Sequence, residues 1–398
     1  MARSRNRPLN KTEIAIIHAL FKHVHHNTGA AVNFGMFQTL SEKISATTQW
    51  YGEFGIQCEV IIGPWHDDDA GVIKTTRPDG TITYDVIKME SHCSPSAVTP
   101  FDSAATGVGG ASRDVVAMGG IPLYVTDFIG TLPLEEEIVI GPCALVGDGR
   151  TCHCGKCQTQ MSSAYRVQLM QEGMVTMCHA LGLQVPAGGF STSFKNCLVP
   201  AVVVTVGGIL IAEQPVTKVA KNVGDKIIFI GKTGPDGNDT SYRAGFAEEE
   251  GMLPAKALFS EELVSMQGAI AAHRTNLVQA CADFGAAGAA AAVCESVRKG
   301  GLGAIVDLSL VRLMGEINIA PQSILLNETQ ARYLLQVRPE HVDIVLSAIR
   351  SRGAFAEVVG EITDGQESIF MYGDEEIAVI PNEPSAADME EVAKATAA

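Results

Sequence analysis

The chain has 398 residues, of which 46% are hydrophobic and 19% are charged, and this composition excludes an intrinsically disordered protein. Its length accommodates two domains of ordinary size. A formal net charge of −16 argues against a general nucleic-acid or anionic-membrane surface, so any anionic ligand needs a local site. We find no signal peptide and no apolar run of membrane-spanning length, and the ten cysteines therefore predict reduced thiols and a cytoplasmic protein.

The first part of the chain predicts helices, then strands that flank an acidic loop. Apolar residues at helical spacing predict a helix over about 9–26, and a second helix over Phe34 to Ser45. The segment CEVIIG, 58–63, is typical of a strand and runs into three aspartates, Asp67 to Asp69. Such a cluster is either a solvated turn or a metal or phosphate site. A hairpin with its turn at Pro78-Asp79-Gly80 follows.

The segment Lys88 to Gly120 concentrates chemically active residues. In the strand YDVIKME, Lys88 and Glu90 are two residues apart and therefore share a face. His92 follows them at the same spacing, and it is the residue of this segment that can transfer a proton near neutral pH.

A glycine-rich helix comes next, over about Ser103 to Met118. It contains Gly107, Gly109 and Gly110. Each glycine costs a helix about 1 kcal/mol relative to alanine, so three together indicate that a ligand or a packed strand approaches this backbone closely. The neighbouring pair Arg113 and Asp114 favours a ligand.

The remainder of the first half predicts a strand at IPLYVTDFIG, a helix from Ser162 to Leu181, a glycine-containing loop at VPAGGFSTSF and a buried strand over 198–212. We place the domain boundary just after that strand. The predicted domains are 1–214, which includes a cysteine-rich insert at 143–157, and 215–398.

The second domain opens with a strand and a glycine-rich loop, GKTGPDGND, that contains Asp236. Such loops offer backbone N–H groups to phosphate, although this one lacks the ending of a P-loop. Helices are predicted over 260–273 and about 274–299, and strands at AIVDLSLV, AFAEVVGEIT and ESIFMYGDEEIAVIP. Because strands and long helices mix without a strict βαβ rhythm, we predict an α+β fold.

The block KMESHCSPSAVTPFDSAATGVGGASRDVVAMGG resembles the signature of the phosphoribosylformylglycinamidine synthase large (synthetase) subunit, in the aminoimidazole ribonucleotide synthetase superfamily. The segments GPWHDDDAGVIK, AGGFSTSF, GDKIIFIGKTGPDGND, DFGAAG, ILLNETQ and VVGEITDG have family counterparts in the same order. The resemblance implies an N-terminal α+β domain that pairs with a second such domain into a β-barrel, and a C-terminal α+β sandwich. A single copy of this unit implies a homodimer, which also suits edge strands that need partners.

The resemblance also implies roles for individual residues. Lys88 would contact ATP phosphates with the glycine loop at Gly234 and Gly237, and Mg²⁺ would be bound by Glu90, Asp114 and Asp236. His92 would accept a proton. The implied substrate contacts are Ser91, Cys93, Ser94, Arg113, Glu328, Thr329 and Gln330. The implied reaction is phosphorylation of an amide oxygen by ATP, followed by attack of ammonia or an amine.

The sequence departs from the family on the substrate side. The family's N-terminal catalytic His is replaced by Lys43, a Tyr three residues further on by Ala46, and a His-Asn-His triplet by His92-Cys93-Ser94. Lys43 cannot act as an imidazole and can supply only a cation or, if desolvated, an amine. We therefore expect the same activation chemistry on a divergent acceptor.

The cysteine-rich insert TCHCGKC has no family counterpart among these motifs. The spacing of Cys152, Cys154 and Cys157 suits a metal knuckle with three thiolates. The fourth ligand would be Cys143, Cys178 or His153. Zn²⁺ is the first choice and an iron–sulfur cluster the second, and the alternative is a surface loop of free thiols.

Three functions follow from these features. The first is an ATP- and Mg²⁺-dependent C–N ligase of the amidine- or amide-forming type, which resembles an enzyme of purine biosynthesis. The second is a small-molecule kinase of the same superfamily. The third is a non-catalytic paralogue that acts as a partner protein. No glutaminase domain is visible in the sequence, so a ligase would take ammonia from solution or from a separate glutaminase.

Overall fold

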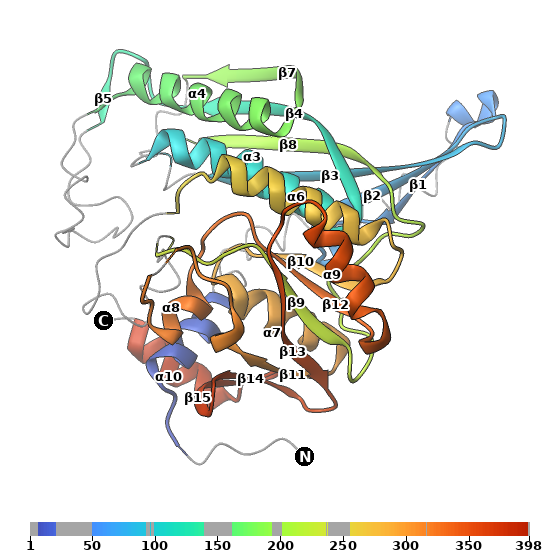
Figure 1. Cartoon of the computed structure of the whole chain (residues 1–398). Helices are drawn as coiled ribbons and strands as arrows, with labels where there is room; N and C mark the ends of the chain where they lie inside the picture. Colours follow the sequence, from blue (N-terminus) through green and yellow to red (C-terminus); the bar gives the residue numbers. More distant parts are fainter. Residues whose placement is uncertain are drawn as a thin grey trace.

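The computed structural model describes residues 7–20, 50–92, 96, 99–138, 161–192, 201–235, 237, 255–315 and 317–396. These residues form two domains that each pair one sheet with helices (Figure 1). The mixed α+β, two-domain architecture predicted from the sequence is confirmed.

The first sheet has the strand order β1-β2-β3-β8-β4-β7 among the described residues. Its strands are β1 (Gln57–Ile62), β2 (Gly71–Thr76), β3 (Ile82–His92), β4 (Gly120–Gly130), β7 (Gln184–Ser191) and β8 (Ala201–Leu210). Neighbouring strands run antiparallel except β4 and β7, which are parallel. The β2–β3 hairpin and the buried strand β8 match the sequence predictions.

One face of this sheet is covered by the helices α3 (Pro100–Ala117) and α4 (Ser163–Leu181). Methionines of α4, such as Met170 and Met177, pack with the small residues of α3 and with Val204 and Val206 of β8 into one core. Ser162 caps α4 by accepting a hydrogen bond from the Tyr165 amide, and Gly182 ends it in a left-handed conformation. The helix predicted over Ser162 to Leu181 is confirmed.

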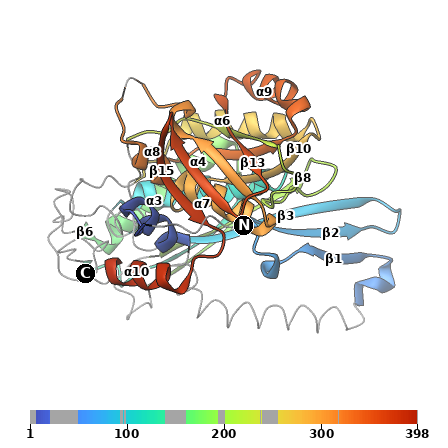
Figure 2. The ribbon, with the colours of Figure 1, turned by 90° about the horizontal axis from the view of Figure 1, so that it is seen from below.

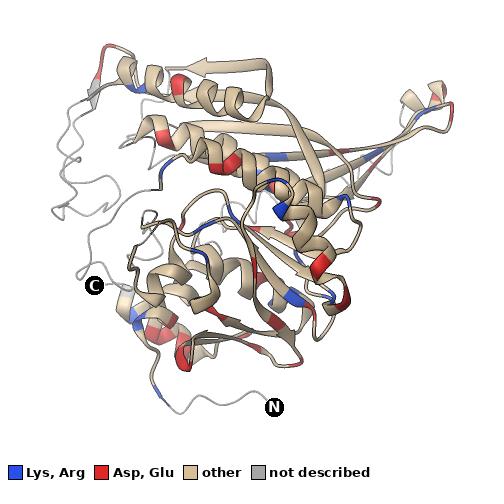
Figure 3. Cartoon of the chain, viewed as in Figure 1, with Lys and Arg blue, Asp and Glu red and all other residues tan. Residues whose placement is uncertain are grey.

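The opposite face of the first sheet carries exposed apolar side chains from three strands, and we call it the uncovered face because no described helix packs on it. They include Met89 of β3, Tyr124 and Phe128 of β4, and Ile209 of β8. The strands β4, β7 and β8 carry few charged residues (Figure 3). β1, β2 and the outer part of β3 extend away from the rest of the molecule as an arm (Figures 1 and 2).

The second sheet has the order β10-β12-β9-β13-β11-β14-β15 among the described residues. Its strands are β9 (Lys226–Ile230), β10 (Val278–Asp283), β11 (Gly303–Asp307), β12 (Tyr333–Val337), β13 (Ala356–Thr363), β14 (Glu367–Tyr372) and β15 (Glu375–Pro381). β11 and β14 are parallel, and the other neighbours are antiparallel. Every residue of β12 is buried, because helices cover both faces of this sheet.

The helices α6 (Phe259–His273) and α9 (Val342–Arg350) cover one face. The helices α7 (Gly288–Gly300), α8 (Pro321–Leu326) and α10 (Ala386–Thr396) belong to the other side, together with residues 11–20, which are helical. Ile16 and Ile17 are fully buried there, and the Val379 amide donates to Glu13. Residues 7–20 therefore pack on the second domain, whereas the sequence analysis assigned them to the first.

The two domains meet along α3 and α6, which lie between the two sheets (Figure 1). The end of α3, at Val116 and Ala117, belongs to the same core as Met266 of α6 and Tyr333 of β12. Two short strands, β5 (Glu137–Ile138) and β6 (Met161–Ser162), pair with each other beside α4. Within the described part of the chain, no helix is long and apolar enough to cross a membrane.

Two sequence predictions of local structure are wrong. Residues 278–283 form strand β10 rather than part of a helix over 274–299, because tertiary pairing with β12 overrides the helical propensity of the alanines. The segment predicted as a loop around Gly188 and Gly189 is strand β7. These glycines leave room for the side chains of Asp127 and Phe128 on β4, which would lie 2.4 and 2.7 Å from an added Cβ.

Candidate active site between the two domains

The site begins on β3, where Lys88, Glu90 and His92 alternate along the strand and face α3. Lys88 Nζ lies 2.7 Å from Asp114 Oδ2 and donates to the Asp69 carbonyl oxygen at 2.9 Å. Burial lowers the pKa of Lys88, but the charges of Asp114 and Glu90 outweigh it and raise the pKa overall. Lys88 is therefore a fixed cation between two segments that carry acids.

Three carboxylates converge at this point from different elements. Asp69 ends the loop before β2, Asp114 comes from α3 and Asp283 ends β10. One oxygen from each lies within 4.8 Å of the others. Burial and the neighbouring acids raise the pKa of Asp114 and of Asp283, against the opposing effect of Lys88 and Arg113.

The cluster fits a hard divalent cation. Carboxylate oxygens are the ligands that Mg²⁺ and Ca²⁺ take, at about 2.0–2.6 Å. Asp69 Oδ2 is buried and has no hydrogen-bond partner, which leaves one oxygen available to a ligand. A bound cation would also reduce the repulsion among the three carboxylates. We conclude that Asp69, Asp114 and Asp283 form a candidate Mg²⁺ site.

His92 is held between two acceptors. Its Nδ1 lies 2.7 Å from the Ser103 carbonyl oxygen, and its Nε2 lies 3.3 Å from Glu90 Oε1. Because both ring nitrogens face oxygens, the doubly protonated ring suits this geometry. Burial lowers the pKa of His92, but the Glu90 hydrogen bond and charge raise it overall. Glu90 thus controls the protonation of His92.

The glycines of α3 are explained by these side chains. An added Cβ would lie 3.0 Å from Glu90 Oε1 at Gly110, 3.2 Å from Glu262 Oε2 at Gly109 and 3.6 Å from His92 Nδ1 at Gly107. The sequence left open whether a ligand or a packed strand approaches this helix. In the structure the approaching groups are protein side chains from β3 and α6.

Arg113 is buried at the contact between the two domains. Its side chain is 2% exposed, and its guanidinium bonds Glu262 at 2.7 Å, Asp283 at 3.3 Å and Gln330 at 2.7 Å. Burial lowers the pKa of Arg113, but Glu262 and Asp283 outweigh it and keep it charged. Arg113 therefore connects the first domain to three segments of the second, and its predicted contact with a substrate phosphate or carboxylate stays a prediction.

The acidic loop before β2 also binds the second domain. Lys218 Nζ lies 3.2 Å from Asp69 Oδ1 and 3.0 Å from Glu295 Oε2, and Lys299 lies 2.9 Å from Asp67. Lys218 and Lys299 thereby fix the position from which Asp69 reaches the carboxylate cluster.

The glycine loop of the second domain packs on the NETQ segment. The Gly234 amide donates to the Thr329 hydroxyl at 3.1 Å, and the Gly237 carbonyl accepts from the Glu328 amide at 2.8 Å. Gly237 has φ +83°, and an added Cβ would lie 2.6 Å from the Glu328 backbone. Glu328 accepts from the Ala287 amide, while Thr329 is fully buried. Of the predicted triplet, Gln330 is the residue that lines a cavity.

Two other predicted residues that the structure describes, Ser91 and Cys178, are not brought to this cluster. Ser91 is exposed on β3 and alternates with Glu90 and His92, so it lies on the uncovered face. The residues that lie outside the described part of the chain are Lys43, Cys93, Ser94, Asp236, Cys143, Cys152, Cys154 and Cys157. Cys178, the alternative metal ligand, is packed in the core of the first domain, where burial raises its thiol pKa to about 11.

Three acidic residues of the site, two from the carboxylate cluster and one that bonds Arg113, were not assigned by the sequence analysis. Asp69 belongs to the run of three aspartates, which the sequence analysis predicted to be a solvated turn or a metal or phosphate site. That prediction did not say which of the three would be the ligand. Asp283 was hidden because its strand was read as a helix, although the DFGAAG motif marked the position. Glu262 carried no signal, since an acid in the first turn of a helix is also common on the surface.

Comparison with known families agrees with this two-domain layout. Residues 67–210 match the N-terminal domain of AIR synthase related proteins, and residues 222–373 match the C-terminal domain of the same proteins. Together the two models account for most of the chain. The protein therefore belongs to the AIR synthase related family.

Within that family, the chain is similar to phosphoribosylformylglycinamidine synthase subunit PurL. It is 33% identical to the PurL of Methanopyrus kandleri over 334 residues, which are 81% of this chain and 41% of the relative. The chain spans about two fifths of the length of this curated relative.

Solved structures give the same assignment. Thermotoga maritima PurL complexed with ATP matches with a TM-score of 0.60 and 25% identity, and the same protein complexed with FGAR matches with a TM-score of 0.62 and 26% identity. The matches cover 78% and 75% of this chain and 44% and 45% of those chains. E. coli HypE, a hydrogenase maturation protein, shares the fold at 13% identity and a TM-score of 0.53, over 76% of this chain and 88% of HypE.

Proposed function

We propose that the protein is an ATP-dependent C–N ligase that activates an amide oxygen by phosphorylation for attack by ammonia or an amine. The observation that carries the proposal is the carboxylate cluster of Asp69, Asp114 and Asp283 beside Lys88, with His92 on the same face of β3. This combination supplies a cation site, a fixed phosphate-binding cation and a proton-transfer group. The similarity to PurL, which is solved in complex with ATP, supports the same assignment.

In the proposed site, Asp69, Asp114 and Asp283 would hold Mg²⁺, which would neutralise charge on the triphosphate when bound. Lys88, whose Nζ lies 2.7 Å from Asp114 Oδ2, would donate to a phosphate oxygen of the bound triphosphate. The amide oxygen of the acceptor attacks the γ-phosphorus, and ADP leaves. Arg113 donates to Asp283 and Gln330 and would hold both side chains in place during this step.

The second step needs a base for the incoming nitrogen. The nitrogen attacks the activated carbon, inorganic phosphate leaves, and His92 Nε2 takes the proton released from the nitrogen. In the resting geometry Glu90 favours the charged imidazolium. A substrate group that hydrogen-bonds Glu90 would weaken its contact with His92, lower the pKa of His92 and free Nε2 as a base.

The acceptor is proposed to differ from that of the relatives. Lys43, Cys93 and Ser94 stand where the family has His, Asn and His, and all three positions concern the substrate. Lys88 and Asp114 keep the residue types that the resemblance implies for ATP and metal, whereas Glu90, which the resemblance implies as a further Mg²⁺ ligand, contacts His92 and lies outside the carboxylate cluster. An amide related to FGAR, which T. maritima PurL binds, is therefore the first acceptor to test.

The proposed assembly is a homodimer through the uncovered face of the first sheet. Met89, Tyr124, Phe128 and Ile209 expose apolar surface there, and a second copy would cover it and close the pair of sheets into a barrel. Phe128→Glu should produce a monomer in sedimentation analysis, whereas a dimer that persists would contradict this interface. Ammonia is proposed to come from solution or from a separate glutaminase.

The decisive assay measures ADP formation with Mg²⁺ and ATP against amides, with and without ammonia or an amine. ADP that forms only with an amide and a nitrogen donor together supports the ligase. A phosphorylated product without the nitrogen donor supports a kinase. If no ADP forms under any condition, the protein is not an ATP-using enzyme and the partner-protein alternative gains support.

The cysteine-rich insert remains a proposed zinc site. Metal analysis of the purified protein should find one equivalent of zinc, which Cys154→Ser removes. Iron with sulfide would indicate a cluster instead, and metal-free protein with full activity would refute the site.

A further inference from the structure

The aspartates of the acidic loop before β2 are bound one by one by groups from the second part of the chain. Lys299 Nζ, on α7, lies 2.9 Å from Asp67 Oδ2. The backbone amide of Lys218, which lies between β8 and β9, donates to Asp68 Oδ1 at 3.2 Å. These two contacts attach the loop to the second domain without the ammonium group of Lys218.

That ammonium group lies between two carboxylates. Lys218 Nζ is 3.2 Å from Asp69 Oδ1 and 3.0 Å from Glu295 Oε2, and the Lys218 side chain is 9% exposed. Burial lowers the pKa of Lys218, but the charges of Asp69 and Glu295 outweigh it and raise the pKa overall. Lys218 is therefore a permanent positive charge at a fixed position.

Asp69 is shared between Lys218 and the carboxylate cluster. Its Oδ1 contacts Lys218, whereas its Oδ2 is buried and has no hydrogen-bond partner among the described residues. A carboxylate that faces two cations is typical of two-metal sites, in which the metal ions lie about 3.5–4 Å apart. Here one position is the candidate Mg²⁺ site, and an ammonium group of the protein holds the other.

A cavity of about 100 Å³ reaches the same carboxylates. Its acidic lining consists of Asp69, Asp283 and Glu295, and alanines, a glycine and Leu20 form its other walls. A single water needs about 10–15 Å³ by this measure, so the cavity has room for a divalent cation with several of its water ligands. Space therefore does not limit the cluster to one divalent cation, and the charge of Lys218 is the remaining restriction.

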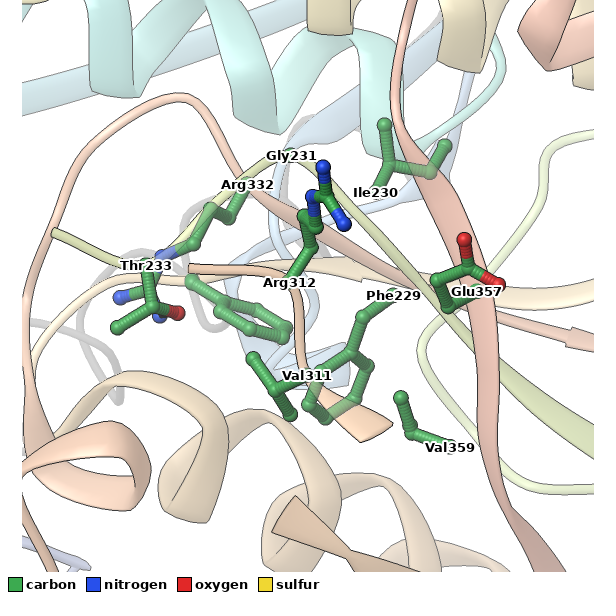
Figure 4. Close-up of a pocket in the computed structure, with 10 residues that line it drawn as sticks. Phe229, Ile230, Gly231, Thr233, Val311, Arg312, Arg332, Glu357 and Val359 are labelled. Atoms are coloured by element: carbon green, nitrogen blue, oxygen red, sulfur yellow. Dashed lines mark hydrogen bonds between the residues drawn. The ribbon is translucent and has the colours of Figure 1, made fainter. Parts of the chain in front are cut away.

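Arg332 shows how a buried cation with a structural role differs from Lys218. Figure 4 shows Arg332 and Phe229 among the side chains around the space beneath Gly231, where only about 10 Å³ remains. Arg332 donates to the Thr233 hydroxyl at 2.9 Å and lies 4.8 Å from the Phe284 ring. Lys218, in contrast, contacts two carboxylates that line a larger cavity.

We propose that Lys218 acts as a built-in second cation, which takes the place of a second divalent ion between Asp69 and Glu295 and limits the cluster to one divalent cation. The proposal rests on the cation site of the proposed function and does not depend on the ligase chemistry. Because the ammonium charge is permanent, the charge balance at Asp69 is independent of the Mg²⁺ concentration. Without this ammonium group, Asp69 and Glu295 become ligands for a second divalent ion.

The test counts the Mn²⁺ ions that bind to the full chain without nucleotide, by calorimetry and by EPR spectroscopy. Mn²⁺ takes the same oxygen ligands as Mg²⁺, and two adjacent Mn²⁺ ions give a spin-coupled spectrum. Wild type should bind one uncoupled ion at the cluster. Lys218→Met keeps the length of the side chain and removes its charge, so it should bind two coupled ions. The second ion should bind about tenfold or more tightly than any second ion in wild type.

Four variants control this count. Asp69→Asn identifies ions that bind elsewhere on the chain. Lys299→Met removes another lysine contact of the acidic loop and should keep one ion at the cluster. Lys218→Arg keeps the charge and should also keep one ion. The double variant Lys218→Met, Glu295→Gln should return the count from two to one, because it removes the second ligand.

Two coupled ions in wild type overturn the proposal, as does a single ion in Lys218→Met with a native circular dichroism spectrum. Wild type that binds no Mn²⁺ overturns it as well. If Lys218→Met does not fold, Glu295→Gln decides. This variant leaves the ammonium charge on Asp69 alone and should weaken the one Mn²⁺ about threefold or more, and unchanged binding overturns the proposal.

The assay of ADP formation separates this proposal from the ligase function. If the count changes from one ion to two in Lys218→Met while wild type forms no ADP, the role of Lys218 stands and the ligase proposal fails. If wild type forms ADP with an amide and a nitrogen donor while the count does not change, the ligase stands and the role of Lys218 is wrong.

Discussion

Asp283→Asn separates the two roles that the structure gives to Asp283. As a member of the carboxylate cluster, Asp283 repels Asp69 and Asp114. As a partner of Arg113, it stabilises a buried cation. Asparagine keeps the size of the side chain and an oxygen that can accept from Arg113, but it removes the charge.

The magnitudes follow from the distances. At an effective dielectric constant of 20, two like charges 4.8 Å apart repel by about 3.5 kcal/mol, so the two repulsions together reach about 7 kcal/mol. The lost attraction to Arg113 at 3.3 Å is worth about 5 kcal/mol on the same scale. The substitution should therefore leave the metal-free protein as stable as wild type, or more stable by about 2 kcal/mol.

The metal-bound protein should respond in the opposite direction. Loss of one of three carboxylate ligands is expected to weaken Mg²⁺ binding at least tenfold, which removes about 1.4 kcal/mol of ligand-linked stability at saturating wild-type concentrations. Urea denaturation in EDTA and in excess Mg²⁺ measures both terms. Asp364→Asn, which changes an exposed turn carboxylate, is the control for net charge.

The reasoning is refuted if Asp283→Asn loses about 3 kcal/mol or more in EDTA and keeps the full Mg²⁺-induced gain. That result would make Asp283 a structural partner of Arg113, because breaking a buried ion pair costs about 3–5 kcal/mol.

Three further changes test the surroundings of the site. Gly110→Ala should stabilise helix α3 by about 1 kcal/mol, but the added methyl group should displace Glu90. Turnover should therefore fall about tenfold, while thermal unfolding should show no loss of stability. Unchanged turnover would contradict the packing argument. Glu90→Gln removes the charge that raises the pKa of His92, so the acidic limb of the pH–rate profile should move to lower pH, and a stationary limb would exclude His92 as the base. Burial lowers the pKa of His273 to about 4, below the unfolded value of about 6.5, so the unfolded chain takes up the proton first as pH falls. Stability should drop by about 2 kcal/mol between pH 7 and pH 5 in wild type, and His273→Gln should remove this part of the pH dependence in urea denaturation.

Most of the first domain could be predicted from local sequence patterns. The alternation of Lys88, Glu90 and His92 placed three side chains on one face of β3, and the apolar run of β8 indicated a buried strand. These predictions depend on a period of two, which is a property of neighbouring residues. Strand β10 was missed because its small residues fit a helix equally well, and only pairing with β12, about 50 residues away in sequence, decides between the two.

The candidate site could be predicted only as far as its residues are close in sequence. Arg113 bonds partners that lie 149, 170 and 217 residues away, and no pattern around Glu262 or Asp283 announces such a contact. The sequence analysis predicted a ligand near Arg113 because the pair Arg113 and Asp114 lies beside three glycines, and the family resemblance implied a substrate phosphate or carboxylate. The structure satisfies its guanidinium with Glu262, Asp283 and Gln330. These contacts depend on how the two domains pack against each other, which local sequence patterns do not encode.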